Sequence, residues 1–434
     1  MREGLRGNRD LVVLAGGSGV SSLGAQLTLI GFTTELAGLG AFAVAGLFVA
    51  AALGAVAGAP LAGWAVDRFR NRPLLAGTVF AQVLLLVGLL LGHAHLPVLY
   101  GLIALLGLTG GIVRTCGSVL IPLTTGEDHA MRGYAWLSSA ENTGSVAGTV
   151  LGGLIAVGPG IEAALVLDAV ATLAHVVMVL RLRVDRDPRQ DDGGPAGPTS
   201  PWSGLVLLRS DRLLLGRVAA QTVGGVAVAI ALVNEVFLVH GPVGGNDFTY
   251  GVMLGCWTGG TLIGAAVSRR FTTARALVAA FATGNLVLGV ALVAPALVPH
   301  AVVNGLAWIV AGACGAVQNV TLSGLVRVRT PDALRGRVFA TVGAVTAGAG
   351  TVGLVAASAV VGGAGPRGAL LVAAAFAALS GLMAWLVVFR RTRIPAPFES
   401  YEPAEEQADG AADAQVDGPS RVKPAANALR IGTK

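Results

Sequence analysis

The segment Gly63-Trp-Ala-Val-Asp67-Arg68-Phe-Arg-Asn-Arg72 places a cluster of charged side chains between two long apolar stretches, 41–63 and 73–94. Its first part recurs as Gly264-Ala-Ala-Val-Ser268-Arg269-Arg270-Phe, which also separates two apolar stretches. Position 264 follows position 63 by 201 residues. A recurrence of this kind predicts that the chain contains a duplicated unit.

A second, shorter pair of segments supports the duplication. Met131-Arg132-Gly133 and Leu334-Arg335-Gly336 stand in equivalent loops, and position 335 follows position 132 by 203 residues. Two matches at nearly the same separation indicate two similar halves. Parallel halves around an axis along the membrane normal are an architecture of transporters, with the binding site between the halves near mid-bilayer.

The composition excludes a water-soluble globular protein. Of the 434 residues, 54% are hydrophobic and 12% are charged, whereas soluble proteins average about 25% charged residues. A membrane-spanning helix needs about 20 mainly apolar residues. We predict an all-α membrane protein with two pseudo-symmetric six-helix halves, whose twelve spans lie at 11–35, 41–63, 73–94, 97–122, 134–157, 161–181, 212–239, 248–267, 275–294, 299–325, 337–361 and 367–389.

The positive charges predict the orientation of these spans. With the N-terminus inside the cell, every basic residue of 1–391 except Arg114 and Arg367 is assigned to a cytoplasmic segment, including those of the stretch 181–217. Such asymmetry is the positive-inside rule. We therefore expect a multi-pass protein of the cytoplasmic membrane with both termini in the cytoplasm.

The spans divide the chain into four parts. Residues 1–181 are predicted to form the N-terminal half and 212–391 the C-terminal half. The segment 182–211 is a charged, Pro/Gly-rich cytoplasmic linker between them. The tail 392–434 has little apolar content, which predicts a disordered cytoplasmic segment.

Several cofactor-dependent classes are disfavoured. The phosphate-binding loop of an ATPase needs a lysine, and the chain's lysines are Lys423 and Lys434, so it carries no ATPase of its own. Cys116, Cys256 and Cys314 are widely spaced in apolar stretches and show no metal-ligand pattern. We expect no cofactor, no metal, no nucleic-acid partner and no enzyme activity. The expected partners are lipid, a small-molecule substrate and protons, and the expected state is a monomer.

The segment at 63–72 resembles the cytoplasmic loop signature G-x-x-x-D-R-x-x-x-R of the major facilitator superfamily. Gly63, Asp67, Arg68 and Arg72 match it without a gap. The resemblance implies a loop that stabilises one of two access states through cytoplasmic contacts. The alternative is that these charges only set the topology.

The second half contributes weaker counterparts of this gating segment. Arg269 and Arg335 stand in the corresponding loops. Ser268 replaces the acidic residue of the first copy. We therefore expect the second copy to hold the gate less strongly.

A glycine pattern in the fifth span resembles the stretch G-x-x-x-G-P-x-x-G-G of antiporters in this superfamily. The matching residues are Gly144, Gly148, Gly152 and Gly153. Thr149 replaces the proline. The resemblance implies close helix packing and favours antiport, whereas the bend linked to the proline is not implied.

Further segments are similar to the macrolide-efflux-type branch, which consists of drug:proton antiporters. They are Arg114-Thr-Cys-Gly117 in the fourth span, Asn234-Glu235 in the seventh, and 331–339 before the eleventh. An acidic residue common in the first span of that branch is absent, and Gly24-Ala25-Gln26 stands in its place. The coupling chemistry is therefore left open.

Ionisable residues inside the spans are the first candidates for function, because a charge in hydrocarbon costs about 3 kcal/mol or more. Arg114 and Glu141 lie at depths of roughly 15 and 10 Å from the same membrane side, so a salt bridge between them is feasible. In one reading Glu141 takes a proton and releases Arg114 during transport. In the other, a static ion pair holds the two helices together.

Three more carboxylates have two readings each. Glu235, preceded by Asn234, is either a substrate or gate residue or an interfacial carboxylate. Asp168 either lines the cavity or belongs to a structural polar cluster. Glu35 lies at the outer end of its span, which favours a structural reading.

Uncharged polar residues follow helical spacing in two spans. Ser18, Ser22, Gln26 and Thr33 share one face of the first span, and Asn304, Trp308, Gly315 and Asn319 share one face of the tenth. These faces either line a cavity or supply hydrogen bonds between helices.

These observations favour a secondary active transporter that exports a small hydrophobic or cationic molecule by proton antiport, with the two halves rocking between access states. The alternatives are a proton-linked uptake symporter of a small solute and, less favoured, a non-transporting membrane receptor.

Overall fold

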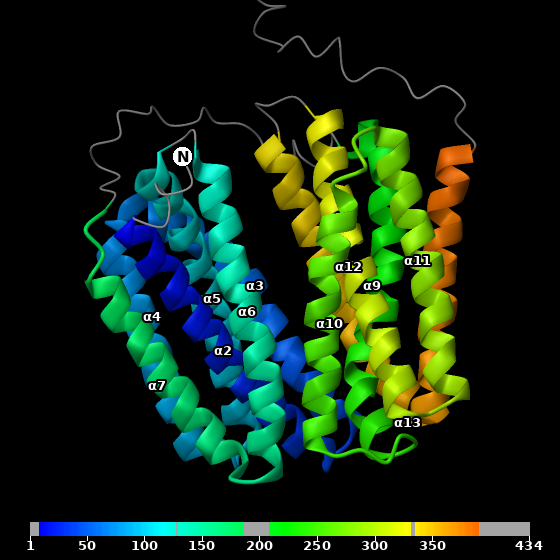
Figure 1. The fold of residues 1–434 in the computed structure, drawn as a ribbon, viewed down its shortest axis with the longest axis horizontal. Helices are drawn as coiled ribbons and strands as arrows, with labels where there is room; N and C mark the ends of the chain where they lie inside the picture. The colour runs from blue at the N-terminus through cyan, green and yellow to red at the C-terminus, as the bar shows by residue number, and fades with distance from the viewer. Residues whose placement is uncertain (1–7, 127–128, 186–207, 331–334, 390–434) are drawn as a thin grey trace, which may run out of the picture. The chain divides into compact units, whose positions relative to one another are not determined.

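The computed structural model describes residues 8–126, 129–185, 208–330 and 335–389. They form long α-helices that run back and forth across the molecule (Figure 1). The N-terminal half contains α2 (Arg9–Ala37), α3 (Ala41–Arg68), α4 (Asn71–Gly92), α5 (Leu96–Thr125), α6 (Ala130–Val157) and α7 (Gly160–Leu180). The C-terminal half contains α9 (Arg212–His240), α10 (Asp247–Ser268), α11 (Ala274–Leu297), α12 (Ala301–Arg329) and α13 (Arg335–Phe389).

Helix α13 contains the last two predicted spans. Its backbone leaves the helical conformation at Gly365, where φ is 65° and ψ is 174°. A positive φ suits glycine, and Pro366 comes directly after it, so the chain reverses here into a second arm. With α13 counted as two arms, the described helices account for all twelve predicted spans, and the predicted fold class is confirmed.

Ten of the described helices, with α13 counted once, are long and apolar enough to cross a membrane. The helix outside this group is α6. Its first half carries Ser138, Ser139, Glu141 and Asn142, which lower its hydropathy. A polar span must face protein or a water-filled cavity rather than lipid, so the composition of α6 already indicates where its first half points.

The pairing of helices recurs in the two halves. In the N-terminal half α2 packs against α6 and α7, α3 against α5, and α4 against α5 and α7. In the C-terminal half α9 packs against α13, α10 against α12, and α11 against α12 and α13. The two halves meet through α6 with α10 and through α3 with α13, so each half presents the equivalent pair of helices to the other.

Small residues allow these helices to approach backbone to backbone. A Cβ atom on Gly58 of α3 would lie 2.8 Å from the Cα atom of Leu108 of α5. In the second half, a Cβ atom on Gly264 of α10 would lie 2.7 Å from the Cα atom of Ala313 of α12. Side chains larger than glycine do not fit at such contacts, which are typical of packing between membrane helices.

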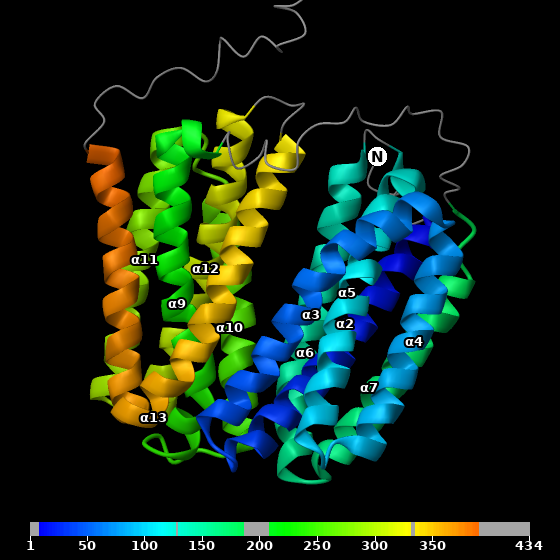
Figure 2. The same ribbon diagram turned by 180° about the vertical axis from the view of Figure 1, so that it is seen from behind.

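The ends of the helices define two ends of the bundle. Helices α2, α9 and the first arm of α13 begin, and α7 ends, at what we call the linker end, because the residues that flank 186–207 lie there (Figures 1 and 2). We call the opposite end the far end. Near the far end, side chains of both halves share one hydrophobic core that includes Phe32, Val44, Val236 and Tyr250.

Near the linker end the N-terminal half has a separate core, which includes Leu14, Val79, Leu120 and Val179 and contains no residue of the other half. Within the described residues, the two halves are therefore packed together near the far end. The sequence predicts that the linker end is cytoplasmic, and with that orientation this arrangement is closed toward the outside.

Candidate functional site

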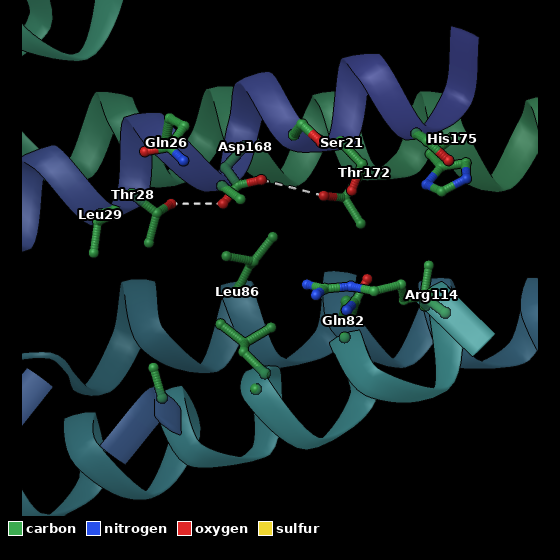
Figure 3. A pocket seen from close by; sticks show the side chains of 18 of the residues that line it. Ser21, Gln26, Thr28, Leu29, Gln82, Leu86, Arg114, Asp168, Thr172 and His175 are labelled. Carbon is green, nitrogen blue, oxygen red and sulfur yellow. Dashed lines mark hydrogen bonds between the residues drawn. The ribbon is translucent and has the colours of Figure 1, made fainter. Parts of the chain in front are cut away.

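A cavity of about 520 Å³ lies inside the N-terminal half. Helices α2 and α7 form one wall, and α4 and α5 form the opposite wall (Figure 3). Its polar lining includes hydroxyl, amide and charged side chains: Ser18, Ser21, Ser22, Gln26 and Thr28 of α2, Gln82 of α4, Arg114 of α5, Glu141 of α6, and Asp168, Thr172 and His175 of α7. The cavity thus gathers Gln26, Arg114, Glu141 and Asp168, which were candidates on sequence alone.

The cavity changes character along its length. Most of its large apolar lining side chains, among them Leu29, Phe32, Leu47 and Ile103, come from parts of α2, α3 and α5 nearer the far end, whereas Val113 and Leu137 line the other end. Arg114, Glu141 and His175 lie nearer the linker end of their helices. One end of the cavity can therefore accommodate an apolar group and the other a polar or charged group.

Arg114 and Glu141 face the same cavity but do not form the ion pair considered from the sequence. The side chain of Arg114 is exposed to the cavity and that of Glu141 is half-buried. Neither makes a hydrogen bond or an ion pair with another described residue. The charge of Arg114 acts on Glu141 through space. The donors of the guanidinium and the acceptors of the carboxylate remain available to a ligand.

Asp168 is held by hydroxyl groups rather than by a cation. Its side chain is buried, with 4% exposure. The Thr28 hydroxyl donates to Oδ2 at 2.6 Å, and the Thr172 hydroxyl donates to Oδ1 at 3.2 Å (Figure 3). Asp168 packs on Gly24, where a Cβ atom would lie 3.0 Å from the Asp168 Cγ atom. The first span lacks an acid at this level, and a carboxylate from α7 occupies the adjoining space.

His175 lines the cavity and was not identified from the sequence. Its ring is buried, with 1% exposure, and neither ring nitrogen has a hydrogen-bond partner among the described residues. The ring packs on Gly17, where a Cβ atom would lie 3.1 Å from Nε2. A signal was present in the sequence, because Asp168, Thr172 and His175 are spaced by four and three residues and so share one face of a helix.

Glu235 and Asn234 lie outside this cavity. Both are fully buried in α9, and Glu235 accepts a hydrogen bond from Asn304 Nδ2 at 2.6 Å. Asn234 donates to the carbonyl oxygen of Pro366 at 3.0 Å, where α13 turns. Thr33, expected on the polar face of the first span, is also outside the cavity and donates to Leu29 O. The reading of Glu235 as a water-exposed interfacial carboxylate is wrong, because its exposure is 0%.

Asn319 and its neighbour Gln318 face different ways. Asn319 is exposed and donates to Gly315 O of its own helix. Gln318 is buried and donates to Asn285 Oδ1 at 3.3 Å. Sequence analysis selected Asn319, whereas Gln318 is the residue that joins a polar network inside the C-terminal half.

Arg217 is the cation of this network. Sequence analysis assigned it to a cytoplasmic segment, but it is fully buried within α9. Its guanidinium donates to Gln221 Oε1 and Gln318 O, both at 2.9 Å, and lies 3.3 Å from the ring centroid of Phe281. Cation–π and hydrogen-bond partners offset the loss of water around a buried guanidinium, which explains why it can be placed here.

The segment 63–72, for which the sequence resemblance implies a gating role, is mostly helical rather than a loop. Gly63, Asp67 and Arg68 belong to the last turns of α3, and Arg72 belongs to the first turn of α4. Asp67 is exposed. Arg72 donates from its backbone N–H to Asp185 Oδ1 at 2.9 Å and from Nη2 to Leu180 O at 2.6 Å. Asp185 Oδ2 also accepts a hydrogen bond from Arg70 Nε at 2.9 Å, so these contacts connect the segment 63–72 to the residues that follow α7.

In the second copy of this segment, Arg269 is the C-cap residue of α10 and is exposed. Arg335 begins α13, and its side chain lies outside the described residues, as do the linker 186–207 and the tail 390–434. Among the described residues, no three His, Cys, Asp or Glu side chains gather as a metal site.

The fifth-span glycines face two different partners. Gly144, Gly148 and Gly152 lie against α2 at Gly19, Leu23 and Leu27. Gly153 lies against α10 of the other half, and a Cβ atom on it would lie 3.2 Å from Gly251 Cα. Thr149, which replaces the proline of the resembled pattern, is a regular helical residue whose hydroxyl donates to Val146 O.

The helices and the polar cavity within them define a polytopic helical membrane protein of the transporter type. The chain belongs to the Major Facilitator Superfamily, whose sequence model matches residues 13–307. This superfamily consists of transporters rather than enzymes. No curated protein matches the sequence.

Solved structures share the fold at low sequence identity. The nucleoside transporter NupG matches with a TM-score of 0.71 and 13% identity, covering 89% of this chain and 100% of its own. The human organic anion transporter TETRAN matches with a TM-score of 0.61 and 19% identity, covering 87% of this chain and 99% of its own. A D-xylose-proton symporter matches with a TM-score of 0.64 and 15% identity, covering 86% of this chain and 97% of its own. At these identities the likeness shows the fold alone.

Proposed function

We propose that this protein is a secondary active transporter that exports a small amphiphilic molecule by proton antiport, in the manner of macrolide-efflux-type transporters. The observation that carries the proposal is the cavity in the N-terminal half, where an apolar end adjoins a polar end with the unpaired charges of Arg114 and Glu141. A ligand with a hydrophobic body and a polar or cationic head complements both ends.

Alternating access provides the route. The halves pack together near the far end through Gly153 and Gly251 and through the shared core. Exchange with the other access state requires this contact to open and the linker ends to close. When the linker ends are closed, we expect the segment 63–72 to contact the C-terminal half, with the exposed carboxylate of Asp67 available for that contact.

The direction and location belong to the same proposal. The protein lies in the cytoplasmic membrane as a monomer, with the linker end and both termini in the cytoplasm. The glycines of α6 favour antiport, and antiport of a proton that enters the cell drives substrate outward. Buried carboxyl groups without a cation partner, Asp168 and Glu235, give the protein places where a proton neutralises a costly charge.

The test is accumulation of cationic ethidium and anionic fluorescein by cells that express the protein, with and without a protonophore. Export predicts that accumulation is low and rises when the proton gradient collapses. Arg114→Ala abolishes the effect while the protein stays in the membrane, whereas Arg367→Ala, at an exposed site two residues after the Gly365 turn of α13, does not. Gradient-dependent uptake would instead establish the symporter, and no change for any probe would favour a receptor.

A further inference from the structure

Resting on the proposed function, we propose that the Asp168–Thr172–His175 face of α7 carries the coupling proton. The Asp168 carboxyl group binds it, and His175 passes it to the linker end. The three side chains line one cavity and follow each other along one helix face (Figure 3). Glu141, the proton carrier considered from the sequence, then has a different task beside Arg114.

The surroundings of Asp168 suit both of its protonation states. Its two oxygens are bonded to hydroxyl groups, Thr28 at 2.6 Å and Thr172 at 3.2 Å. A hydroxyl group can donate to a carboxylate or rotate and accept from a carboxylic acid. The same partners therefore hold the group before and after proton release, without a rearrangement of the helices. An arginine or lysine in that place would favour only the charged form.

His175 provides the next position for the proton. It follows Asp168 by seven residues, which places it about 10 Å nearer the linker end. Both ring nitrogens lack a partner although the ring is buried. An unpaired buried polar group destabilises the folded protein, which a residue with only a packing role would have no reason to retain. Imidazole can accept a proton at one nitrogen and release one from the other.

The other ionisable groups of the cavity are Arg114 on α5 and Glu141 on α6, while α2, α3 and α4 contribute none. Arg114 acts electrostatically on Glu141. Glu141 is only half-buried and faces the Arg114 charge, so its carboxyl group has a cation nearby and access to the cavity. Asp168 has neither a cation partner nor free access to water.

The proton step balances within these groups. The O–H bond of Asp168 breaks and its electron pair stays on the carboxylate. The Thr172 hydroxyl accepts this proton and gives up its own to a water molecule in the cavity that both residues line, and that water passes a proton to a ring nitrogen of His175. The imidazolium then releases the proton on its other nitrogen to water at the linker end. In the reverse direction the same groups load Asp168.

The first test uses purified protein in liposomes with ethidium as the probe. Gradient-driven accumulation is compared with exchange of labelled for unlabelled ethidium at equal pH on both sides. Asp168→Asn is expected to lose accumulation and to keep exchange, because exchange needs no net proton movement. Glu141→Gln is the comparison, and its remaining transport is expected to respond to the gradient. Accumulation by Asp168→Asn that still follows the gradient overturns the inference, whereas wild-type protein inactive in both modes overturns the proposed function.

A second measurement needs no transported probe. Infrared difference spectra between acid and alkaline pH report the carbonyl band of a protonated carboxyl group. Measured in a Glu235→Gln background, so that the other buried carboxyl group does not contribute, this band is expected to be lost in Asp168→Asn and kept in Glu141→Gln. His175→Phe is expected to keep the band but to slow gradient-driven accumulation. An unchanged band in Asp168→Asn overturns the assignment of the proton to Asp168. Undiminished accumulation in His175→Phe overturns the transfer of the proton through His175.

Discussion

Gly153 of α6 and Gly251 of α10 lie backbone to backbone across the two halves. A Cβ atom on Gly153 would lie 3.2 Å from Gly251 Cα, and one on Gly251 would lie 3.0 Å from Gly153 Cα. The backbone carbonyl oxygens of Thr149 and Asp247 lie against the same two glycines. A side chain at either glycine therefore has no space while the halves remain together near the far end.

Gly251→Leu is expected to separate the halves near the far end and so to favour the other access state. Spin labels at Arg132→Cys and Arg270→Cys, at the linker ends of α6 and α10, report this change in a background with the native cysteines replaced. The labels are expected to move closer together. Gly259→Leu is the control on the same helix, because a Cβ atom there meets nothing within 4 Å. Equal distances in both variants would contradict the far-end contact as a gate.

The unpaired charges of the cavity make a prediction about ligand choice. Arg114→Gln removes the positive charge and leaves Glu141, so binding is expected to shift toward cationic amphiphiles. Glu141→Gln is expected to shift it the opposite way. Binding of a cationic and a neutral amphiphile with the same apolar part, measured by fluorescence titration, gives the ratio. A ratio that is unchanged in both variants would mean that the head group binds elsewhere.

Buried Glu235 depends on Asn304 for its hydrogen bond. Asn304→Ala removes the donor that lies 2.6 Å from Glu235 Oε1, next to an Oε2 atom that is already buried without a partner. We expect a loss of about 1–3 kcal/mol in the free energy of unfolding, seen as a lower unfolding temperature in detergent. Asn319→Ala is the matched control on α12, since its amide is exposed and bonds only within its own helix. A surface change of that kind is worth about 0.5 kcal/mol or less.

The positions of the spans were predictable because apolar length is a strong signal in a membrane protein. The predicted break between 361 and 367 falls at Gly365, where a glycine and a proline are adjacent. Arg114, Glu141 and Asp168 were predictable as candidates because charges in spans are rare. That these three side chains line one cavity was not predictable, because the pattern of charges along the sequence does not determine how each helix is rotated about its own axis.

Gln318 and Asn319 show how small that missing information is. Successive residues of a helix point about 100° apart, so one amide enters the interior of the C-terminal half and the next is exposed. The apolar stretches around both give no periodic contrast from which the facing side can be derived. Arg217 was misplaced for a related reason. The positive-inside rule counts every arginine near the end of a span as cytoplasmic. It cannot distinguish an arginine in the loop from one that is buried inside the first turns of the helix, as Arg217 is in α9.

The buried ion pair of Asp211 and Arg329 ties the linker ends of α9 and α12 together. The Arg329 Nε and Asp211 Oδ2 atoms are 2.7 Å apart, with side-chain exposures of 9% and 3%. Asp211 also caps α9, because Oδ1 accepts from the backbone N–H groups of Leu213 and Leu214. One carboxylate thus serves two functions through its two oxygens.

Asp211→Asn keeps an oxygen for the helix cap and removes the charge that faces Arg329, whereas Asp211→Ala removes both. Loss of one partner of a buried pair costs about 3–5 kcal/mol, and loss of the cap adds about 1 kcal/mol. We therefore expect both variants to unfold at lower temperature in detergent, with Asp211→Ala the lower of the two. If Asp211→Asn unfolds like the wild type, the ion pair does not stabilise the linker end of the C-terminal half.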